Sequence, residues 1–262
     1  MSYLIVCATA LLVSGLTLFS GFGLGTLLMP VFALFFPIEV AVAATAVVHG
    51  ANNIFKVAVV GRHADRAIVL KFGLPAILAA FAGASLLAYL SVFGELLSYS
   101  IGSRTAVITP IKLVMALLML VFALFELLPT LRNLKFDRRY LPLGGVLSGF
   151  FGGLSGHQGA LRSAFLVKVG ISTEAFVGTN AVIGFMVDVV RIVTYIGLLF
   201  AVRTARSTET LHWPLILAGI GAAFVGVLIG KRSMKKVTMQ AVQTLTGILL
   251  LGIALALGTG II

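Results

Sequence analysis

The chain has 262 residues, of which 60% are hydrophobic and only 10% are charged, whereas an ordinary soluble domain carries roughly 25% charged residues. A soluble fold of this length cannot bury the apolar surface that a mean hydropathy of +1.15 implies. The composition therefore excludes a soluble protein. It predicts an all-α integral membrane protein, organised as one transmembrane domain over residues 1–262.

The net charge is +11, which would suggest a nucleic-acid partner in a soluble protein. Here Lys and Arg fall in short segments between apolar stretches, as in 132–139 and 231–236, where they orient membrane helices. The expected partner is therefore the lipid bilayer, and no nucleic acid is expected.

The single cysteine, Cys7, excludes an intramolecular disulfide and a cysteine-cluster metal site. The sequence also has no metal-ligand spacing, no nucleophile constellation and no phosphate loop in a suitable context. We therefore expect no metal and no cofactor, and we do not expect an enzyme.

Eight long apolar stretches run along the chain, and the first begins without a basic residue before it, which favours a membrane helix over a cleavable signal peptide. The second stretch is far longer than the ~20 residues that a span needs. It contains Pro30 and Pro37, and Pro37 is expected to end one helix and to open another. The stretches are 3–20, 26–60, 68–94, 106–128, 141–167, 174–201, 211–230 and 242–260.

The segment 26–36 would be only roughly 16 Å long as a helix, too short for ~30 Å of hydrocarbon. A half-helix or part of a re-entrant hairpin is expected there. The stretch 141–167 has a similar Gly/Ser cluster in its middle. Broken helices are therefore predicted near Gly21–Gly25 and near Gly152–Gly159.

The chain also repeats itself weakly. A shift of 134 residues superimposes four pairs of identical residues: Gly25 on Gly159, Leu27 on Leu161, Thr45 on Thr179 and Gly50 on Gly184. This ordered correspondence predicts two homologous halves, at about 1–130 and 138–262.

The distribution of basic residues selects a topology. If both broken regions are split, each half has five segments, and an odd number makes the two halves inverted repeats. Twelve basic residues then share one side, which is the cytoplasmic side by the positive-inside rule, and both termini lie outside the cytoplasm. These residues are Arg62, Arg66, Lys71, Arg132, Lys135, Arg138, Arg139, Lys168, Lys231, Arg232, Lys235 and Lys236, and the opposite side has Arg104, Lys112, Arg203 and Arg206.

Four charged residues lie inside the apolar stretches: Lys56, Arg162, Asp188 and Arg191. Each central charge costs roughly 2.5–3.5 kcal/mol on insertion scales, so it is expected to face a partner or a cavity. Asp188 and Arg191 are three residues apart and could neutralise each other. Lys56 and Arg191 could instead extend to the headgroups. Arg162 has no acid nearby in sequence and is the leading candidate for substrate contact.

Polar residues form two stripes on one helix face each, which are Thr45, His49, Asn52 and Lys56, and Asn180, Gly184, Asp188 and Arg191. Such stripes either join helices or line a cavity, and their matching positions favour a cavity.

The half-helices starting near Gly25 and Gly159 would turn their N–H groups toward the middle of the protein, which favours anions. Alternatively, these glycines only pack helices. The expected substrate contacts are Arg162, His157, Gln158, Gly25, Gly159, Asn52, Asn180, Thr45 and Thr179. His49, His157 and Asp188 are candidates for proton coupling, and Glu39, Glu126 and Glu174 are set aside.

At these positions the sequence resembles the sulfite exporter TauE/SafE family of membrane transporters. That family has a glycine-rich break before an apolar half-helix, twice, each followed by a helix with an Ala-x-x-Thr-like pattern. The two copies here are Gly21-Phe-Gly-Leu-Gly25 with Ala41-Val-Ala-Ala-Thr45, and Ser155-Gly-His-Gln-Gly159 with Phe176-Val-Gly-Thr-Asn180. Leu24, His157, Gln158 and Ala164 depart from the pattern.

The resemblance implies a secondary transporter in a bacterial inner membrane that exports a small sulfur-containing anion, such as sulfite or an organosulfonate. The residues themselves point to a small anion, since cations outnumber the acid inside the spans. An anion channel and a transporter of a non-sulfur carboxylate stay open as alternatives, and so does a homodimer.

Overall fold

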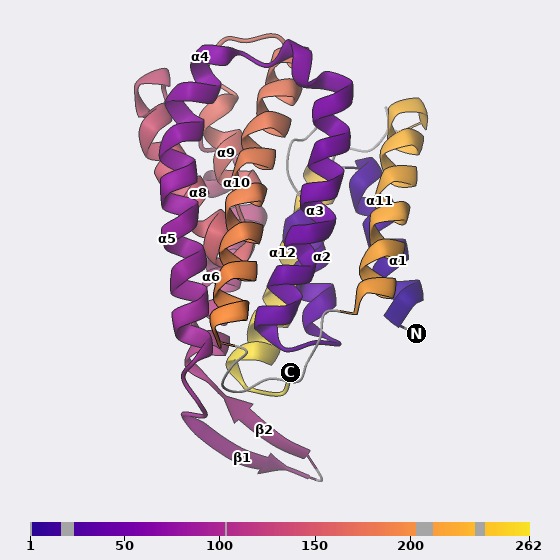
Figure 1. Cartoon of the computed structure of the whole chain (residues 1–262), viewed down its shortest axis with the longest axis vertical. Helices are drawn as coiled ribbons and strands as arrows, with labels where there is room; N and C mark the ends of the chain where they lie inside the picture. The colour runs from indigo at the N-terminus through magenta and orange to yellow at the C-terminus, as the bar shows by residue number, and fades with distance from the viewer. Residues whose placement is uncertain (1, 17–23, 103, 203–211, 234–238) are drawn as a thin grey trace.

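The computed structural model describes residues 2–16, 24–102, 104–202, 212–233 and 239–262. It is an all-α membrane fold with one small hairpin (Figure 1). Within the described residues, five helices are long and apolar enough to cross a membrane: Ile38–His63, Arg66–Ser91, Pro110–Leu127, Thr173–Gly197 and Trp213–Gly230. The predicted fold class is confirmed.

The first part of the chain consists of a short helix pair followed by longer helices. Its elements are α1 (Ser2–Leu16), α2 (Leu24–Ala33), α3 (Ile38–Val60), η1 (Gly61–His63), α4 (Arg66–Ile68), the π-helical turn η2 (Val69–Gly73), α5 (Leu74–Ser91), strands β1 (Leu97–Ile101) and β2 (Arg104–Ile108), α6 (Pro110–Leu127) and α7 (Pro129–Arg132).

The second part follows the same order of short and long helices. Its elements are η3 (Arg138–Tyr140), α8 (Leu141–Ser155), α9 (Gly159–Leu166), α10 (Thr173–Val202), α11 (Trp213–Ser233) and α12 (Met239–Gly258). The half-helices α2 and α9 have 10 and 8 residues, or about 15 and 12 Å at 1.5 Å per residue. Neither can cross the hydrocarbon core alone, as predicted.

Pro37 and a hairpin mark where two of the helices begin. Pro37 directly precedes α3, as expected, whereas Pro30 lies inside α2. The prediction of a membrane helix from residue 106 was wrong, because 104–108 form β2. This strand pairs antiparallel with β1, from Leu97 opposite Ile108 to Ile101 opposite Arg104. β-Branched residues suit this extended backbone.

Glycines bring α8 against α5 at backbone distance. A Cβ built on Gly149 would lie 2.1 Å from the carbonyl oxygen of Ala76 in α5. One turn on either side, Gly153 approaches Ala80 of α5 and Gly145 approaches Phe72 of η2 just as closely. Small residues allow such close packing where lipid cannot drive helices together. The four-residue spacing makes one continuous seam between two helices that run in the same direction.

The same kind of seam joins α1 and α11. A Cβ on Gly226 would lie 2.1 Å from the oxygen of Leu11, and one on Gly230 would lie 2.5 Å from the oxygen of Gly15. Elsewhere α3 packs on α10 and α6 on α12. Every one of these pairings joins the first half of the chain to the second. They have the pattern that two repeats related by a two-fold axis require, although the inverted repeat itself stays a prediction.

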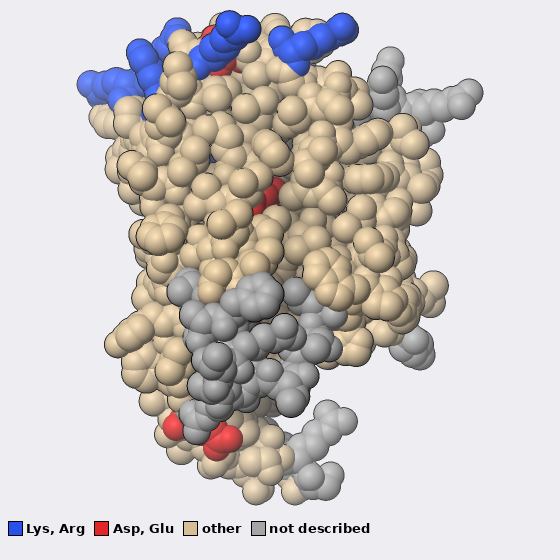
Figure 2. Space-filling view, viewed as in Figure 1, with Lys and Arg blue, Asp and Glu red and all other residues tan. Residues whose placement is uncertain are grey.

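The two ends of the bundle differ in charge. In Figure 1 the hairpin and both chain ends lie at one end, and α4 lies at the other. Figure 2 shows Lys and Arg gathered at the α4 end, above a broad belt without them. The belt is what a hydrocarbon core requires of the surface that faces it.

Candidate functional site

The α8–α9 region is a broken helix that turns back on itself. Gly156 has a φ of +82°, in the left-handed region that glycine adopts without strain, and its N–H donates to the oxygen of Gly152 at 3.0 Å. A Cβ on Gly144, near the start of α8, would lie 2.5 Å from the ring of Phe165, near the end of α9. The two helices therefore form a re-entrant hairpin whose tip is buried.

The two predicted breaks meet in space. A Cβ on Gly25, in the first turn of α2, would lie 3.2 Å from the oxygen of Gly156 and 3.5 Å from the ring of His49. Residues 21–23 of the first break lie outside the described residues. The start of α2, the tip of the α8–α9 hairpin and α3 thus surround one region of the protein.

Arg162 is the fourth residue of α9, and its side chain is only 2% exposed. Its Nε donates to Asn180 Oδ1 at 2.7 Å and its Nη1 donates to Gln158 Oε1 at 2.9 Å. Gly184 makes room, since a Cβ there would lie 3.1 Å from Arg162 Nη1 and 2.8 Å from Asn53 Nδ2. Two neutral amide oxygens therefore fix the plane of a buried guanidinium.

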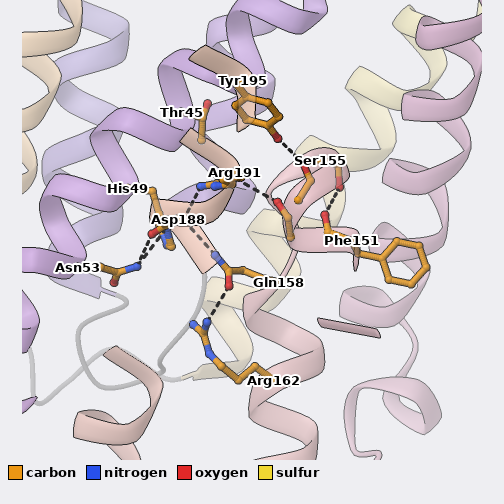
Figure 3. A network of polar contacts seen from close by, with 12 residues as sticks. Thr45, His49, Asn53, Phe151, Ser155, Gln158, Arg162, Asp188, Arg191 and Tyr195 are labelled. Atoms are coloured by element: carbon orange, nitrogen blue, oxygen red, sulfur yellow. Dashed lines mark hydrogen bonds and ion pairs between the residues drawn. The ribbon is translucent and has the colours of Figure 1, made fainter. Parts of the chain in front are cut away.

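Asp188 on α10 is the centre of the polar network (Figure 3). Its Oδ2 accepts from His49 Nδ1 and from Asn53 Nδ2, both at 2.7 Å, and its Oδ1 accepts from Gln158 Nε2 at 3.1 Å. Because His49 Nδ1 donates to the carboxylate, the 3.2 Å approach of Asn53 Nδ2 to that nitrogen is not a second hydrogen bond. Gln158 also accepts from Arg162, so one amide links the acid to the arginine.

The structure shows where the charged side chains of Asp188, Arg191 and Lys56 lie. Asp188 and Arg191 do pair, with Oδ1 and Nη2 2.8 Å apart and both side chains fully buried. The side chain of Arg191 does not extend to the protein surface, because it is completely buried. Lys56 is also buried, at 7% exposure, and the charges of Arg162 and Asp188 act on it. Within the described residues it makes no hydrogen bond or ion pair.

Several buried polar atoms near the network have unused hydrogen-bonding capacity. Among the described residues, no partner is found for either amide atom of Asn52, for Nε2 of His157 or for Nε of Arg191. Buried polar groups are normally satisfied, and leaving one unpaired costs about 1–3 kcal/mol. The hydrogen-bonding capacity of these atoms is unused within the described residues.

Some predicted contacts lie apart from the network. The Thr45 hydroxyl donates to the oxygen of Ala41 within α3. The Thr179 hydroxyl accepts the N–H of Asp65, at the α4 end. His157 contacts Ser155 Oγ at 3.0 Å and stacks on Phe122 of α6, with 5.1 Å between ring centres.

Sequence reasoning missed Asn53 and Tyr195. The stripe selected Asn52, but it is Asn53, four residues after His49, that reaches Asp188. The spacing of Tyr195, four residues after Arg191, could have identified it. Its hydroxyl donates to the oxygen of Gly153 and ties α10 to the tip of the α8–α9 hairpin.

Residues 6–257 match the family described as Sulfite exporter TauE/SafE. The chain belongs to this family. TauE/SafE proteins are membrane transporters of the exporter type, and the chain is a multi-pass membrane protein of that kind. None of the curated proteins compared with the chain matches it. In the part of the chain that the structure describes, no group of His, Cys, Asp or Glu residues could hold a metal ion.

Proposed function

We propose that this TauE/SafE protein is a secondary transporter that exports a small sulfur-containing anion, sulfite or an organosulfonate. The observation that carries the proposal is an excess of buried positive charge. Lys56, Arg162 and Arg191 are at most 7% exposed, and Asp188 is the acid among them. With His49 neutral, the described side chains of the cluster bring together three positive charges and one negative charge.

Such an excess is costly in a membrane interior, because an unpaired buried charge loses its hydration without a counter-charge. A bound anion would supply the counter-charge. Arg162 is suited to hold it, because a guanidinium is planar and its paired N–H donors match the oxygens of a sulfonate or carboxylate. The unused donors of Asn52 and Arg191 can supply further hydrogen bonds.

The proposed contacts combine this cluster with the hairpin tip. Arg162 donates to both Gln158 and Asn180, Gly25 lets α2 approach the carbonyl oxygen of Gly156, and Gly159 is the first residue of α9. His49, Asp188 and Arg191 are proposed to hold the arginine network in place. Thr45 and Thr179 are secondary candidates, since their hydroxyls already have partners.

The proposed orientation places the Lys/Arg end in the cytoplasm of a bacterial cell and both chain ends outside, which the charge distribution in Figure 2 supports. Cysteines added at both ends should react with an impermeant maleimide on intact cells. Labelling only after the inner membrane is opened would contradict this orientation.

Uptake by proteoliposomes tests the function itself. Labelled sulfite, isethionate and a matched carboxylate such as glycolate should be compared at several concentrations. The proposal expects saturable uptake of the sulfur anions, accelerated by the same anion trapped inside. Non-saturable flux would indicate a channel instead, and preference for glycolate would indicate a carboxylate transporter.

A further inference from the structure

A second polar region lies beside α9, outside the Asp188 network. It is a cavity of about 220 Å³ between the end of α6, the α7 turn, α9 and α12. Its polar lining is supplied by Glu126, Arg132, Asn133, Lys135, Ser163 and Gln243. Arg132 and Lys135 belong to the segments that the charge distribution assigns to the cytoplasmic side. The cavity is therefore at the end of the protein from which an exported anion would arrive.

Glu126 is the unusual member of this lining. It is 2% exposed, although it lies one residue before the end of α6. Gln243 approaches the carboxyl from α12 and the charge of Arg132 acts on it, but neither oxygen makes a hydrogen bond of standard geometry within the described residues. Asp188, by contrast, has four polar partners. Unlike Asp188, Glu126 can therefore gain or lose a proton without disrupting a hydrogen-bond network.

The cavity is joined to α9 and thereby to Arg162. Ala160, Leu161, Ser163 and Ala164 of α9 form one wall, while Arg162 points to Asn180 and Gln158. The segment after α7 is bound to the same helix. The N–H of Phe136 donates to the oxygen of Ala164 at 3.2 Å, and its ring stacks on Phe165 with 4.2 Å between centres. One half-helix therefore separates the cavity from the central arginine.

We propose that this cavity is the cytoplasmic vestibule of the anion and that Glu126 must be protonated for a small oxyanion to occupy it. Arg132 and Lys135 attract the anion, and an ionised Glu126 repels it within a cavity of about 220 Å³. The proton adds to a carboxylate oxygen and leaves it again when the anion has moved on. The titratable groups of the described lining are Glu126, Arg132 and Lys135, and the polar groups from α9 and α12 are uncharged. This proposal rests on the proposed transport function.

The test uses isethionate, whose sulfonate stays ionised across the range from pH 6 to pH 8.5, so that only the protein titrates. Inverted membrane vesicles expose the proposed cytoplasmic face, and initial uptake is measured as the external pH is varied with a protonophore present. Protonation of a carboxyl increases as pH falls. Wild-type uptake should therefore rise as pH falls, by up to about tenfold per unit while Glu126 is largely ionised.

Glu126→Gln mimics the protonated carboxyl and should give fast, pH-independent uptake. Asp137→Asn, an exposed acid on the neighbouring segment, is the matched control and should keep the wild-type profile. Arg132→Gln should raise the half-saturation constant roughly tenfold and keep the pH dependence. If Arg132 had only a structural role, its replacement would not raise the half-saturation constant while the pH dependence stays unchanged.

The possible outcomes distinguish the role of Glu126 from the proposed transport function. Isethionate uptake with the same pH profile in wild type and Glu126→Gln overturns the role of Glu126 and leaves the transport function standing. If Glu126→Gln does not fold, a wild-type profile that is flat or that falls with decreasing pH overturns the role equally. Absence of isethionate uptake by the wild type at every pH overturns both proposals.

Discussion

The half-helices α2 and α9 occupy matching places in the two halves, yet they carry different chemistry. Both are short and buried, and both begin at the region where the breaks meet. α2 reads Leu-Gly-Thr-Leu-Leu-Met-Pro-Val-Phe-Ala and has no charge, whereas α9 reads Gly-Ala-Leu-Arg-Ser-Ala-Phe-Leu. Leu28 lies 134 positions before Arg162, and it is completely buried in the apolar core.

The long helices differ in the same way. His49 on α3 corresponds to Ile183 on α10, and Asp188 corresponds to Ile54, which is 56% exposed while the acid is fully buried. The helices α3 and α10 thus have charged and titratable residues at different positions, although they occupy matching places in the two halves. The lesson is that two similar sets of helices can carry different side-chain chemistry, and that position in the set alone does not predict which one carries the buried charges.

The largest effect on stability is expected when Asp188, the central acid of the network, is replaced. Asp188→Ala leaves Arg191 without its ion-pair partner and His49, Asn53 and Gln158 without their acceptor. Loss of one partner of a buried pair typically costs about 3–5 kcal/mol, so thermal unfolding in detergent should show a large fall in Tm. Ile54→Ala, at the matching position, should change stability by no more than about 0.5 kcal/mol. Similar melting of both variants would contradict the central role of Asp188.

A smaller effect is expected from the two matched glycines. Gly184→Ala places a methyl 3.1 Å from Arg162 Nη1 and 2.8 Å from Asn53 Nδ2, whereas Gly50→Ala meets the flexible end of Ile192 at 3.1 Å. Displacing a packed polar network costs about 1–3 kcal/mol. Gly184→Ala should therefore raise the half-saturation constant for isethionate at least tenfold, and Gly50→Ala should change it little. Equal effects would show that Gly184 does not position the arginine.

Arg162→Lys sharpens the comparison further, because it keeps the charge but loses the two oriented bonds to Asn180 and Gln158. An ammonium group cannot reproduce the planar fork of the guanidinium. Affinity for isethionate should fall by about tenfold, or about 1.4 kcal/mol, in a calorimetric titration. Unchanged affinity would mean that only the charge of Arg162 matters.

The smallest effect is expected at Lys56, whose charge acts on the network without a direct bond. Lys56→Gln removes one of the three buried positive charges, and through a partly screened interior it should weaken isethionate binding roughly threefold to tenfold. The same titration measures it. Tighter binding would contradict the inference that excess positive charge attracts the anion.

Part of this arrangement was accessible from the sequence. Pro37 marked a helix boundary, the glycine cluster marked the second break, and the spacing of Asp188 and Arg191 left their pairing as one of two alternatives. Each of these depends on neighbours in the chain. Asn53 was missed because Asn52 and Asn53 are adjacent on a helix and both border the polar stripe. Only the position of α10, more than 100 residues later, decides between them.

Other features depend wholly on contacts between distant elements. The cavity at Glu126 forms where α6, α9 and α12 meet, and nothing near Glu126 in sequence distinguishes it from an ordinary acid at a helix end. The meeting of Gly25 with Gly156 likewise depends on how the two halves pack. The hairpin was missed because its apolar residues continue into α6, so that one apolar stretch contains two structures.

The most direct test of the account compares Arg162→Ala with Leu28→Ala in proteoliposomes, with isethionate uptake normalised to the amount of folded, inserted protein. The account predicts that Arg162→Ala folds, inserts and transports nothing measurable, while Leu28→Ala keeps near wild-type transport per folded molecule despite a less stable core. Normal transport by Arg162→Ala would contradict the account and move the anion site away from α9.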